Sequence, residues 1–523
     1  MKRYISILTV IIILLSVAGC KSDKKDPVNI IYSISDSVTA FDPQIAKSDS
    51  SILIAKNIFE GLIRLDENNS PYSEICTDFT VSQDGLTYTF KLKENLKWSD
   101  GTPLTSNDFR FGIERSLDSA TGSDFASLLF SINNAESYYN GEVSVEELGI
   151  ETPDESTLIF TLSQIDNGFL YALSTPAGAP CKKDFFEETR GKYGLEADKL
   201  ISNGAFYLHS VKDSYIRLQK NENYVFAESV KADNLYIYTN EDSDKAESEF
   251  LNGNRDVIVY DGADIDKFTD SKNTVSAFAD SVWGVAFNLN DEIGKNPDFR
   301  KMLYHSIDSS VVSKTLKDKY GIANGLILPS SDLNGTNYRS ASTFGSFNFD
   351  LEKAEAHYQK FVKTIDGYMP KIDIIYEQND DFKETVSTIP YKCQSSFDIY
   401  INPTALEKEE FDNRLSSSDF QLAFTSIRPH SAEASDMLIY FTDAENILGL
   451  KDDKFNSLVG NINSNSVEKA IQVIENCENY IIRDKTVFIP IAFENNYFIS
   501  SKDIQNLKTK QSKSDIDFRF VTK

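Results

Sequence analysis

The chain has 523 residues, and its 80 acidic and 53 basic residues give a formal charge of −27. Such acidity argues against a nucleic-acid partner, whose phosphates need a cationic surface, and against adsorption to anionic lipid through basic patches. Hydrophobic residues make up 41% of the chain and aromatic residues 12%, which is typical of globular proteins. Because domains usually contain roughly 100–200 residues, we expect two to four lobes.

The first residues depart from this composition. A short positive start, Met1–Arg3, precedes thirteen mostly apolar residues, Ile5–Val17, and then small residues before Cys20. A helix of that length rises about 20 Å, which is short of a hydrocarbon core of about 30 Å. The pattern predicts a secretory signal peptide over 1–19, and its end resembles a bacterial lipobox. That resemblance implies lipidation of Cys20 and a polar tether over 20–27, and a plain signal peptide is the alternative.

Four further cysteines are Cys76, Cys181, Cys393 and Cys477. None lies in a CxxC pair, and export would permit disulfides, with Cys76 and Cys181 as the candidate pair. Cys477 falls on the apolar stripe of a predicted helix, which favours a buried thiol there.

Short β-like runs alternate with amphipathic stretches from Val28 onward, which predicts an α/β protein. Thr105 with Asp108 resembles a capping box that begins a helix. The predicted strands are 28–32, 87–93, 148–150, 158–162, 204–208, 215–218 and 256–260. The predicted helices are 50–62, 106–117, 242–252, 298–316 and 465–483.

Motifs for catalysis and for tight cofactor binding are missing. The four histidines are isolated, and no HExxH, GxSxG, GxxxxGK[ST] or GxGxxG motif occurs. The acidic run Glu241–Asp244 lacks the spacing of an EF-hand, so a solvated face is the simpler interpretation. We therefore expect no enzymatic activity, no cofactor and no metal.

Several ordered sequence blocks resemble the oligopeptide/dipeptide-binding family of ABC importers, which are extracellular solute-binding proteins of family 5. The blocks are Phe41–Pro43, Asn57–Leu62, Asp84–Phe90, Trp98–Thr105 with Asp108 and Phe109, Ser202–Phe206, Lys220–Tyr224 and Phe420–Leu438. The resemblance implies a bilobal periplasmic-binding-protein-like fold with a small extra domain inserted in the first lobe. Carried over, the family boundaries give lobe I as 28–67, 191–285 and 494–523, inserted domain II as 68–190, and lobe III as 286–493.

The resemblance also implies ligand-binding positions in a cleft between the lobes. They are Val38 before the first block and, on and after one strand, Thr425, Ser426, Ile427, Arg428 and His430. Peptide-binding relatives carry an aromatic residue where Ile427 stands and an aspartate where His430 falls, with Glu433 and Asp436 as nearby substitutes. Recognition of a free peptide N-terminus is therefore open.

Two kinds of side chain in this region carry alternative interpretations. A guanidinium at Arg428 favours an anionic ligand group such as a peptide carboxylate, and an ordinary salt bridge to an acidic residue is the alternative. Further candidates for the cleft lining, with core packing as the alternative, are Tyr32, Tyr260, Trp283 and Phe287.

These observations predict a monomeric, lipid-anchored receptor on the outer face of the cytoplasmic membrane. It captures an oligopeptide or similar small solute and delivers it to the membrane permease subunits of an ABC importer. The alternatives are a receptor for a non-peptide solute (an oligosaccharide or a metal chelate), a receptor for a signalling peptide, a secreted hydrolase on the same scaffold, and an adhesin-like lipoprotein.

Overall fold

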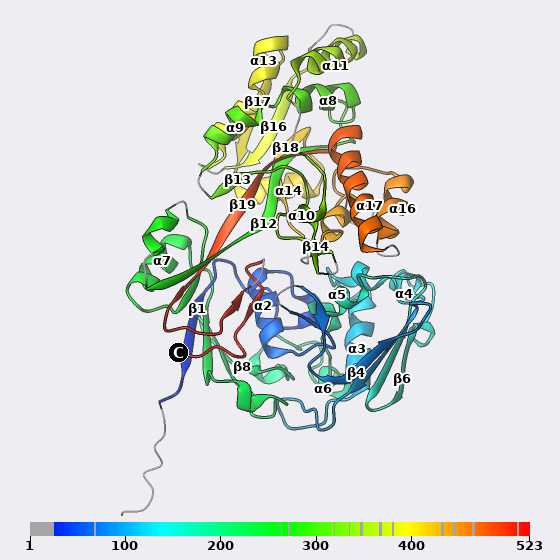
Figure 1. The fold of residues 1–523 in the computed structure, drawn as a ribbon, viewed down its shortest axis with the longest axis vertical. Helices are drawn as coiled ribbons and strands as arrows, with labels where there is room; N and C mark the ends of the chain where they lie inside the picture. The colour runs from blue at the N-terminus through cyan, green and yellow to red at the C-terminus, as the bar shows by residue number, and fades with distance from the viewer. Residues whose placement is uncertain are drawn as a thin grey trace, which may run out of the picture.

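The computed structural model describes residues 26–66, 69–262, 264–269, 272–317, 319–333, 335–345, 349–365, 369–378, 381–429, 433–442, 446–462, 466–509 and 512–523. Two bodies lie one above the other (Figure 1), and an 11-stranded sheet runs through both. The segments predicted as lobe I and domain II lie in the lower body and the segment predicted as lobe III lies in the upper body, and these names are kept for them below. In the part of the chain described, no helix is long and apolar enough to cross a bilayer.

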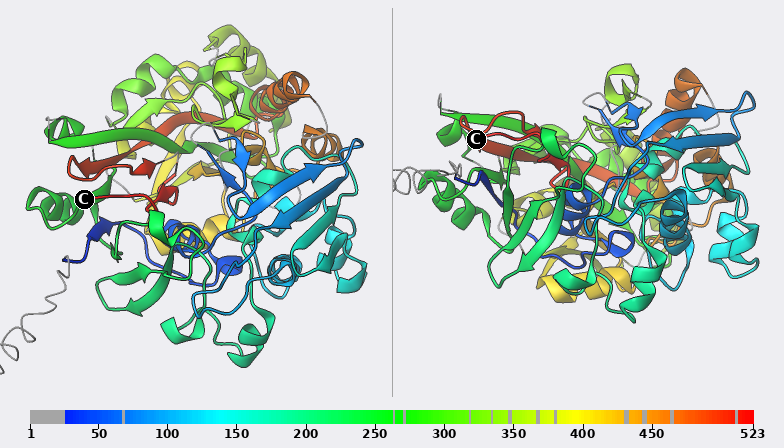
Figure 2. Two further views of the ribbon diagram at one scale, coloured as in Figure 1. Left: turned by 60° about the horizontal axis from the view of Figure 1, so that its bottom comes forward. Right: turned by 90° about the horizontal axis from the view of Figure 1, so that it is seen from below.

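The sheet is continuous because two long strands, β12 (Asn273–Phe287) and β19 (Phe488–Ser501), extend from one lobe into the other. They pair antiparallel over most of their length and lie side by side in every view (Figures 1 and 2). The strand order is β17-β16-β18-β12-β19-β11-β1-β10-β9-β8, with β13 paired to β19. These two strands are therefore the covalent connection about which the lobes can move.

Lobe I lies at the β8 end of the sheet, and its helix α2 (Asp49–Ile58) begins at the N-cap Ser48, whose side chain accepts from the amide of Ser51. The strands of lobe I are β1 (Asn29–Ser33), β8 (Phe206–Val211), β9 (Ile216–Lys220), β10 (Asn234–Tyr238) and β11 (Val257–Tyr260). Helix α7 (Ser243–Leu251) and the short strands β2 (Arg64–Leu65), β20 (Lys508–Thr509) and β21 (Ile516–Asp517) complete it, and β2 pairs with β3 (Pro71–Tyr72) at the start of domain II.

Domain II has its own four-stranded sheet in the order β4-β5-β7-β6. Figure 1 places this sheet on the side of α2 opposite α7. Its strands are β4 (Cys76–Val81), β5 (Thr87–Leu92), β6 (Ile150–Asp154) and β7 (Thr157–Thr161). Its helices are α3 (Ser106–Leu117), α4 (Ala135–Tyr139), α5 (Phe169–Leu173) and α6 (Lys183–Glu188). Thr105 and Asp108 form the predicted capping box of α3.

Lobe III surrounds the other end of the sheet with helices. Its strands besides β12 and β19 are β13 (Tyr320–Ile322), β14 (Asp332–Leu333), β15 (Thr336–Asn337), β16 (Ile372–Glu377), β17 (Ile401–Leu406) and β18 (Leu422–Ile427). Its helices are α8 (Pro297–Ser306), α9 (Ser309–Val312), α10 (Tyr338–Ala341), α11 (Leu351–Thr364), α12 (Lys383–Thr388), α13 (Tyr391–Phe397), α14 (Lys408–Ser416), α15 (Asp436–Ile439), α16 (Asp453–Gly460) and α17 (Val467–Asn479).

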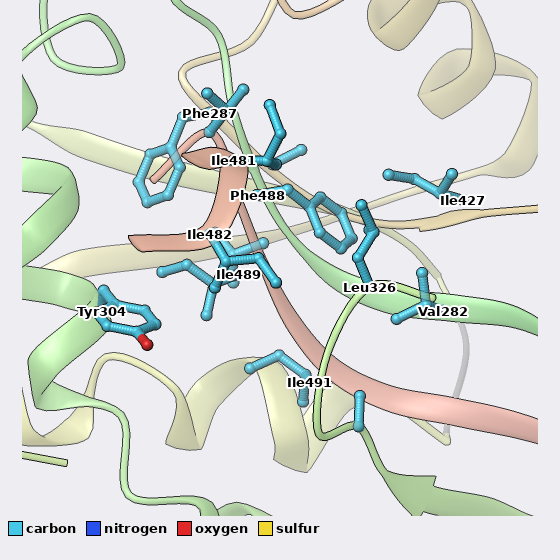
Figure 3. Close-up of a cluster of buried hydrophobic side chains, with 14 of the residues drawn as sticks. Val282, Phe287, Tyr304, Leu326, Ile427, Ile481, Ile482, Phe488, Ile489 and Ile491 are labelled. Carbon is cyan, nitrogen blue, oxygen red and sulfur yellow. The ribbon is translucent and has the colours of Figure 1, made fainter. Parts of the chain in front are cut away.

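The hydrophobic cores follow the same division. One buried cluster fills lobe III, and a second joins lobe I to domain II. Figure 3 shows part of the lobe III cluster, in which Val282 of β12, Ile427 of β18 and Phe488 of β19 gather on the sheet. Because the two large clusters are separate, the lobes can change their relative position without breaking either core.

Three predictions from the sequence need correction. The helix predicted over 298–316 is broken, because Ile307 is extended and the side chain of Asp308 caps α9 by accepting from the Ser310 amide. The helix predicted over 465–483 is α17 followed by a π-helical turn, Tyr480–Asp484. Cys76 and Cys181 are buried free thiols rather than a disulfide. Cys477 is buried as expected.

Candidate functional site: the junction of the two lobes

The predicted ligand strand is β18, and only one of its edges is paired along its whole length. Its residues pair antiparallel with β12 from Leu422 to Ile427. On the other edge, β16 pairs only with Leu422–Phe424. Among the described residues no strand pairs with the second edge of Thr425–Ile427. That edge offers backbone donors and acceptors to an added strand, the arrangement by which extended peptides join a sheet.

The side chains of this strand pack wholly or partly into the protein and do not form the free edge. Ile427 is 1% exposed and lies in the lobe III core beside Val282 (Figure 3). Thr425 is also buried, and Ser426 is half-buried. A ligand on this edge would therefore meet main-chain groups first, which bind without reading side chains.

Lobe I reaches the end of this strand with the start of α2, where Asp49 contacts Arg428, and the loop that carries Val38 is bonded to that helix. The carboxylate of Asp36 accepts from the amide and the hydroxyl of Ser50, at 3.0 and 2.8 Å. Ser51 Oγ accepts from the amides of Thr39 and Ala40. These contacts hold half-buried Val38 next to the first turn of α2.

Arg428 directly follows β18 and joins the two lobes. Its Nη1 donates to Asp49 Oδ2 of lobe I at 2.7 Å, and its Nη2 lies 3.3 Å from Asp280 Oδ2 of β12. Partial burial would lower the pKa of Arg428, but Asp280 and Asp49 raise it above its ordinary value. The structure thus shows the salt bridge that was the alternative interpretation of Arg428.

Asp280 stands at an irregularity of the strand that connects the lobes. The register of β12 against β19 shifts between Ala279 and Ser281, and such bulges redirect a side chain. Asp280 is 2% exposed, and its Oδ1 accepts from Asn496 Nδ2 at 3.1 Å. Burial raises its pKa, while Arg428 and Lys513 oppose that rise. A carboxylate this desolvated needs a cation beside it.

An aromatic group lies on the lobe III side of the same strand. Trp283 is half-buried, packs in a tilted arrangement against Phe382 at a centroid distance of 4.3 Å, and donates from Nε1 to Glu494 Oε2 at 3.0 Å. Tyr32, Tyr260 and Phe287 are core residues, so of these four aromatic candidates only Trp283 keeps partial exposure.

Two other contacts link lobe III to the lower body. Asn69 Nδ2 donates to Asp332 Oδ2, and Gln164 Nε2 donates to the carbonyl of Gly460 at 3.4 Å. Together with the Asp49–Arg428 pair, these hydrogen bonds show that the upper and lower bodies touch each other across the junction.

Several residues that the sequence predicted for lipidation or ligand binding are not among the described residues at the junction of the lobes. Cys20 and His430 lie outside the described residues. Glu433 and Asp436, the suggested substitutes for the missing aspartate, are buried inside lobe III, where Ser435 donates to Glu433. Sequence reasoning missed Asp49 and Asp280 because 80 acidic residues give no signal that distinguishes these two.

A large cavity lies away from this junction. It has a volume of about 760 Å³ and is lined by α2, the β2–β3 hairpin, the 174–179 turn and the C-terminal segment. Among the residues that the structure describes, none from lobe III and none of the predicted ligand positions lines it. Among the described residues no cluster of three or more His, Cys, Asp or Glu side chains could hold a metal ion.

Two lobes joined by long strands, with an open strand edge where they meet, define a bilobal solute-binding protein. The model of the bacterial extracellular solute-binding proteins, family 5, matches residues 70–448. The chain belongs to that family, as its sequence blocks predicted.

Curated relatives and solved structures agree with this assignment. The dipeptide-binding protein DppE of Bacillus subtilis is 25% identical over 477 residues, which cover 90% of this chain and 87% of the relative. Two solved structures share the fold with TM-scores of 0.79, each covering 95% of this chain and 99% of the other. They are the pheromone receptor PrgZ, 22% identical, and the peptide-bound OppA of Listeria monocytogenes, 20% identical.

Proposed function

We propose that this protein is the receptor of an ABC importer, which captures a peptide or peptide-like solute between its lobes and delivers it to permease subunits. The observation that carries the proposal is the edge of Thr425–Ile427 with which no described strand pairs, directly before Arg428, which reaches Asp49 of lobe I. A peptide backbone can add to this edge whatever its side chains are.

The proposed binding surface comprises Val38 from lobe I, the main chain of Thr425, Ser426 and Ile427, and the side chains of Arg428 and His430. The names of the curated relatives and the peptide-bound structure support a peptide as ligand. Closure of the lobes would exclude water from these hydrogen bonds and so strengthen them.

The ligand class is tested by identifying what the purified protein carries. The protein is denatured, its released small molecules are analysed by mass spectrometry, and the refolded protein is then offered pools of two- to five-residue peptides and of oligosaccharides. We expect peptides in the released fraction, together with a rise in melting temperature only with the peptide pool. Recovery of oligosaccharide without peptide would overturn the peptide assignment.

We also propose that the mature protein is held at the outer face of the cytoplasmic membrane through lipid on Cys20. The supporting observation is the apolar segment that ends in small residues at this cysteine. Cys20→Ser should move the protein from the membrane to the soluble fraction, whereas Cys76→Ser, which changes a buried thiol, should not. Membrane retention of Cys20→Ser would contradict the anchor.

A further inference from the structure

We propose that Arg428 is a latch between the lobes and supplies from the protein itself the cation that Asp49 and Asp280 require. Closure of the cleft then does not depend on a charged amino end of the ligand. The inference rests on the proposed function, since it concerns which solutes the same cleft accepts.

The ion pairs of Arg428 connect the two lobes. Arg428 belongs to lobe III, Asp49 is the first residue of α2 in lobe I, and Asp280 lies on β12, which connects them. A rotation that separates the lobes pulls the guanidinium away from Asp49, whereas the bonds inside each lobe survive it. The 2.7 Å contact is therefore one that exists only when the lobes are together.

Two poorly solvated carboxylates share the charge of Arg428. Asp280 is 2% exposed and Asp49 has a side chain that is 13% exposed, so both carboxylates need a positive partner. Asp36 and Glu494 add further negative charge that acts on Arg428, while Lys513 acts on Asp280 from the positive side. In this acidic surrounding a ligand carboxylate gains little from Arg428, because that guanidinium is already shared by two carboxylates.

Arg428 itself stays partly open to solvent. The side chain of Arg428 keeps 44% of its surface exposed, although its Nη1 and Nη2 atoms both contact carboxylates. A pair of this kind is weak enough to break and re-form. It can thus stabilise the closed form without locking it, as a receptor that must release its solute requires.

The structural part of the inference is tested without any peptide. Small-angle X-ray scattering of the ligand-free Cys20→Ser protein compares wild-type lobes with those of Arg428→Met, Asp49→Asn and the double variant. Loss of one ion pair should raise the ratio of open to closed molecules about fivefold, visible as a larger radius of gyration. The double variant should open no further than either single variant, since both remove the same contact.

A matched control is Arg414→Met, because Arg414 pairs with Asp419 inside lobe III and not across the cleft. This control should scatter like the wild type, and Arg428→Lys should recover part of the closed population. Unchanged scattering of both Arg428→Met and Asp49→Asn would overturn the latch.

The specificity part is tested with trialanine and N-acetyl-trialanine on the same variants. Wild type should bind the two probes with affinities within about threefold of each other. Arg428→Met, which leaves Asp49 and Asp280 without their cation, should prefer the free amine at least about tenfold, the effect of one charge-assisted contact. A wild-type preference for the free amine of that size would overturn this part. Binding of neither probe, with intact scattering differences, would instead count against the peptide assignment.

Discussion

Arg519 and Arg428 make similar ion pairs in two different regions of the molecule. Arg519 is 2% exposed, donates to both oxygens of Asp517 and to Glu74, and lies 3.6 Å from Glu60. All of these partners lie in the lower body of the molecule. Arg428 is 44% exposed, and its partners lie in the opposite lobe and in the connecting strand.

The difference shows that the burial of the arginine, rather than the types of residue around it, decides whether such an ion-pair cluster stabilises one lobe or can break between two lobes. The Arg519 cluster fixes the C-terminal segment against α2 and the β2–β3 hairpin, where water cannot replace the carboxylates. The Arg428–Asp49 contact can be exchanged for water at small cost, because the Arg428 side chain is 44% exposed. One cluster therefore stabilises a lobe, and the other responds to the distance between lobes.

The largest expected effect is the loss of Arg519. Arg519→Met removes the direct ion pair of half-buried Asp517 and one of the two arginines beside buried Glu60, which keeps Arg64, so the free energy of unfolding should fall by about 3 kcal/mol. Urea denaturation followed by circular dichroism measures this loss. Arg414→Met, at a more exposed pair, should cost about 1 kcal/mol or less. Equal losses in the two variants would contradict the role assigned to burial.

A smaller loss in the free energy of unfolding is expected when the wild-type protein is brought to acidic pH. Burial would raise the pKa of Asp517, but the hydrogen bonds from Arg519 and the charge of Arg64 outweigh it and lower the pKa to about 2. A lowered carboxyl pKa stabilises the fold above the ordinary value of 3.8, and the contribution is lost as pH falls toward 2. The lost stability is roughly 2 kcal/mol.

Unfolding by urea at a series of pH values from neutral down to about 2.5 measures this contribution. Asp517→Asn should be less stable than wild type at neutral pH and should lose less stability than wild type as the pH falls. Parallel curves for the two proteins would show that Asp517 does not carry the effect.

The smallest expected effect on stability is at the junction. Arg428→Met should change the free energy of unfolding by less than about 1 kcal/mol, since its pair with Asp49 is partly exposed and buried Asp280 keeps the hydrogen bond from Asn496 and the charge of Lys513. Even this difference should shrink at about 1 M salt, where the screening length is about 3 Å, while the loss in Arg519→Met persists. A loss in Arg428→Met as large as that in Arg519→Met would remove the distinction between the two regions.

Local structure could be read from the sequence wherever neighbouring residues decide it. Thr105 and Asp108 are three positions apart, and their capping box starts α3 at the predicted residue. The predicted helix over 298–316 was wrong because an apolar periodicity continues through Ile307, whereas the capping side chain of Asp308 starts a new helix there.

The sequence by itself determined the family, the alternation of strands and helices, and the strand that carries the open edge. Only the tertiary structure decided which of the 80 acidic residues meets Arg428. Asp49 lies 379 positions away in the chain, and Asp280 acts through a bulge that only the pairing of β12 with β19 creates. Contacts of this range depend on how the lobes pack, and composition or local pattern carries no signal for them.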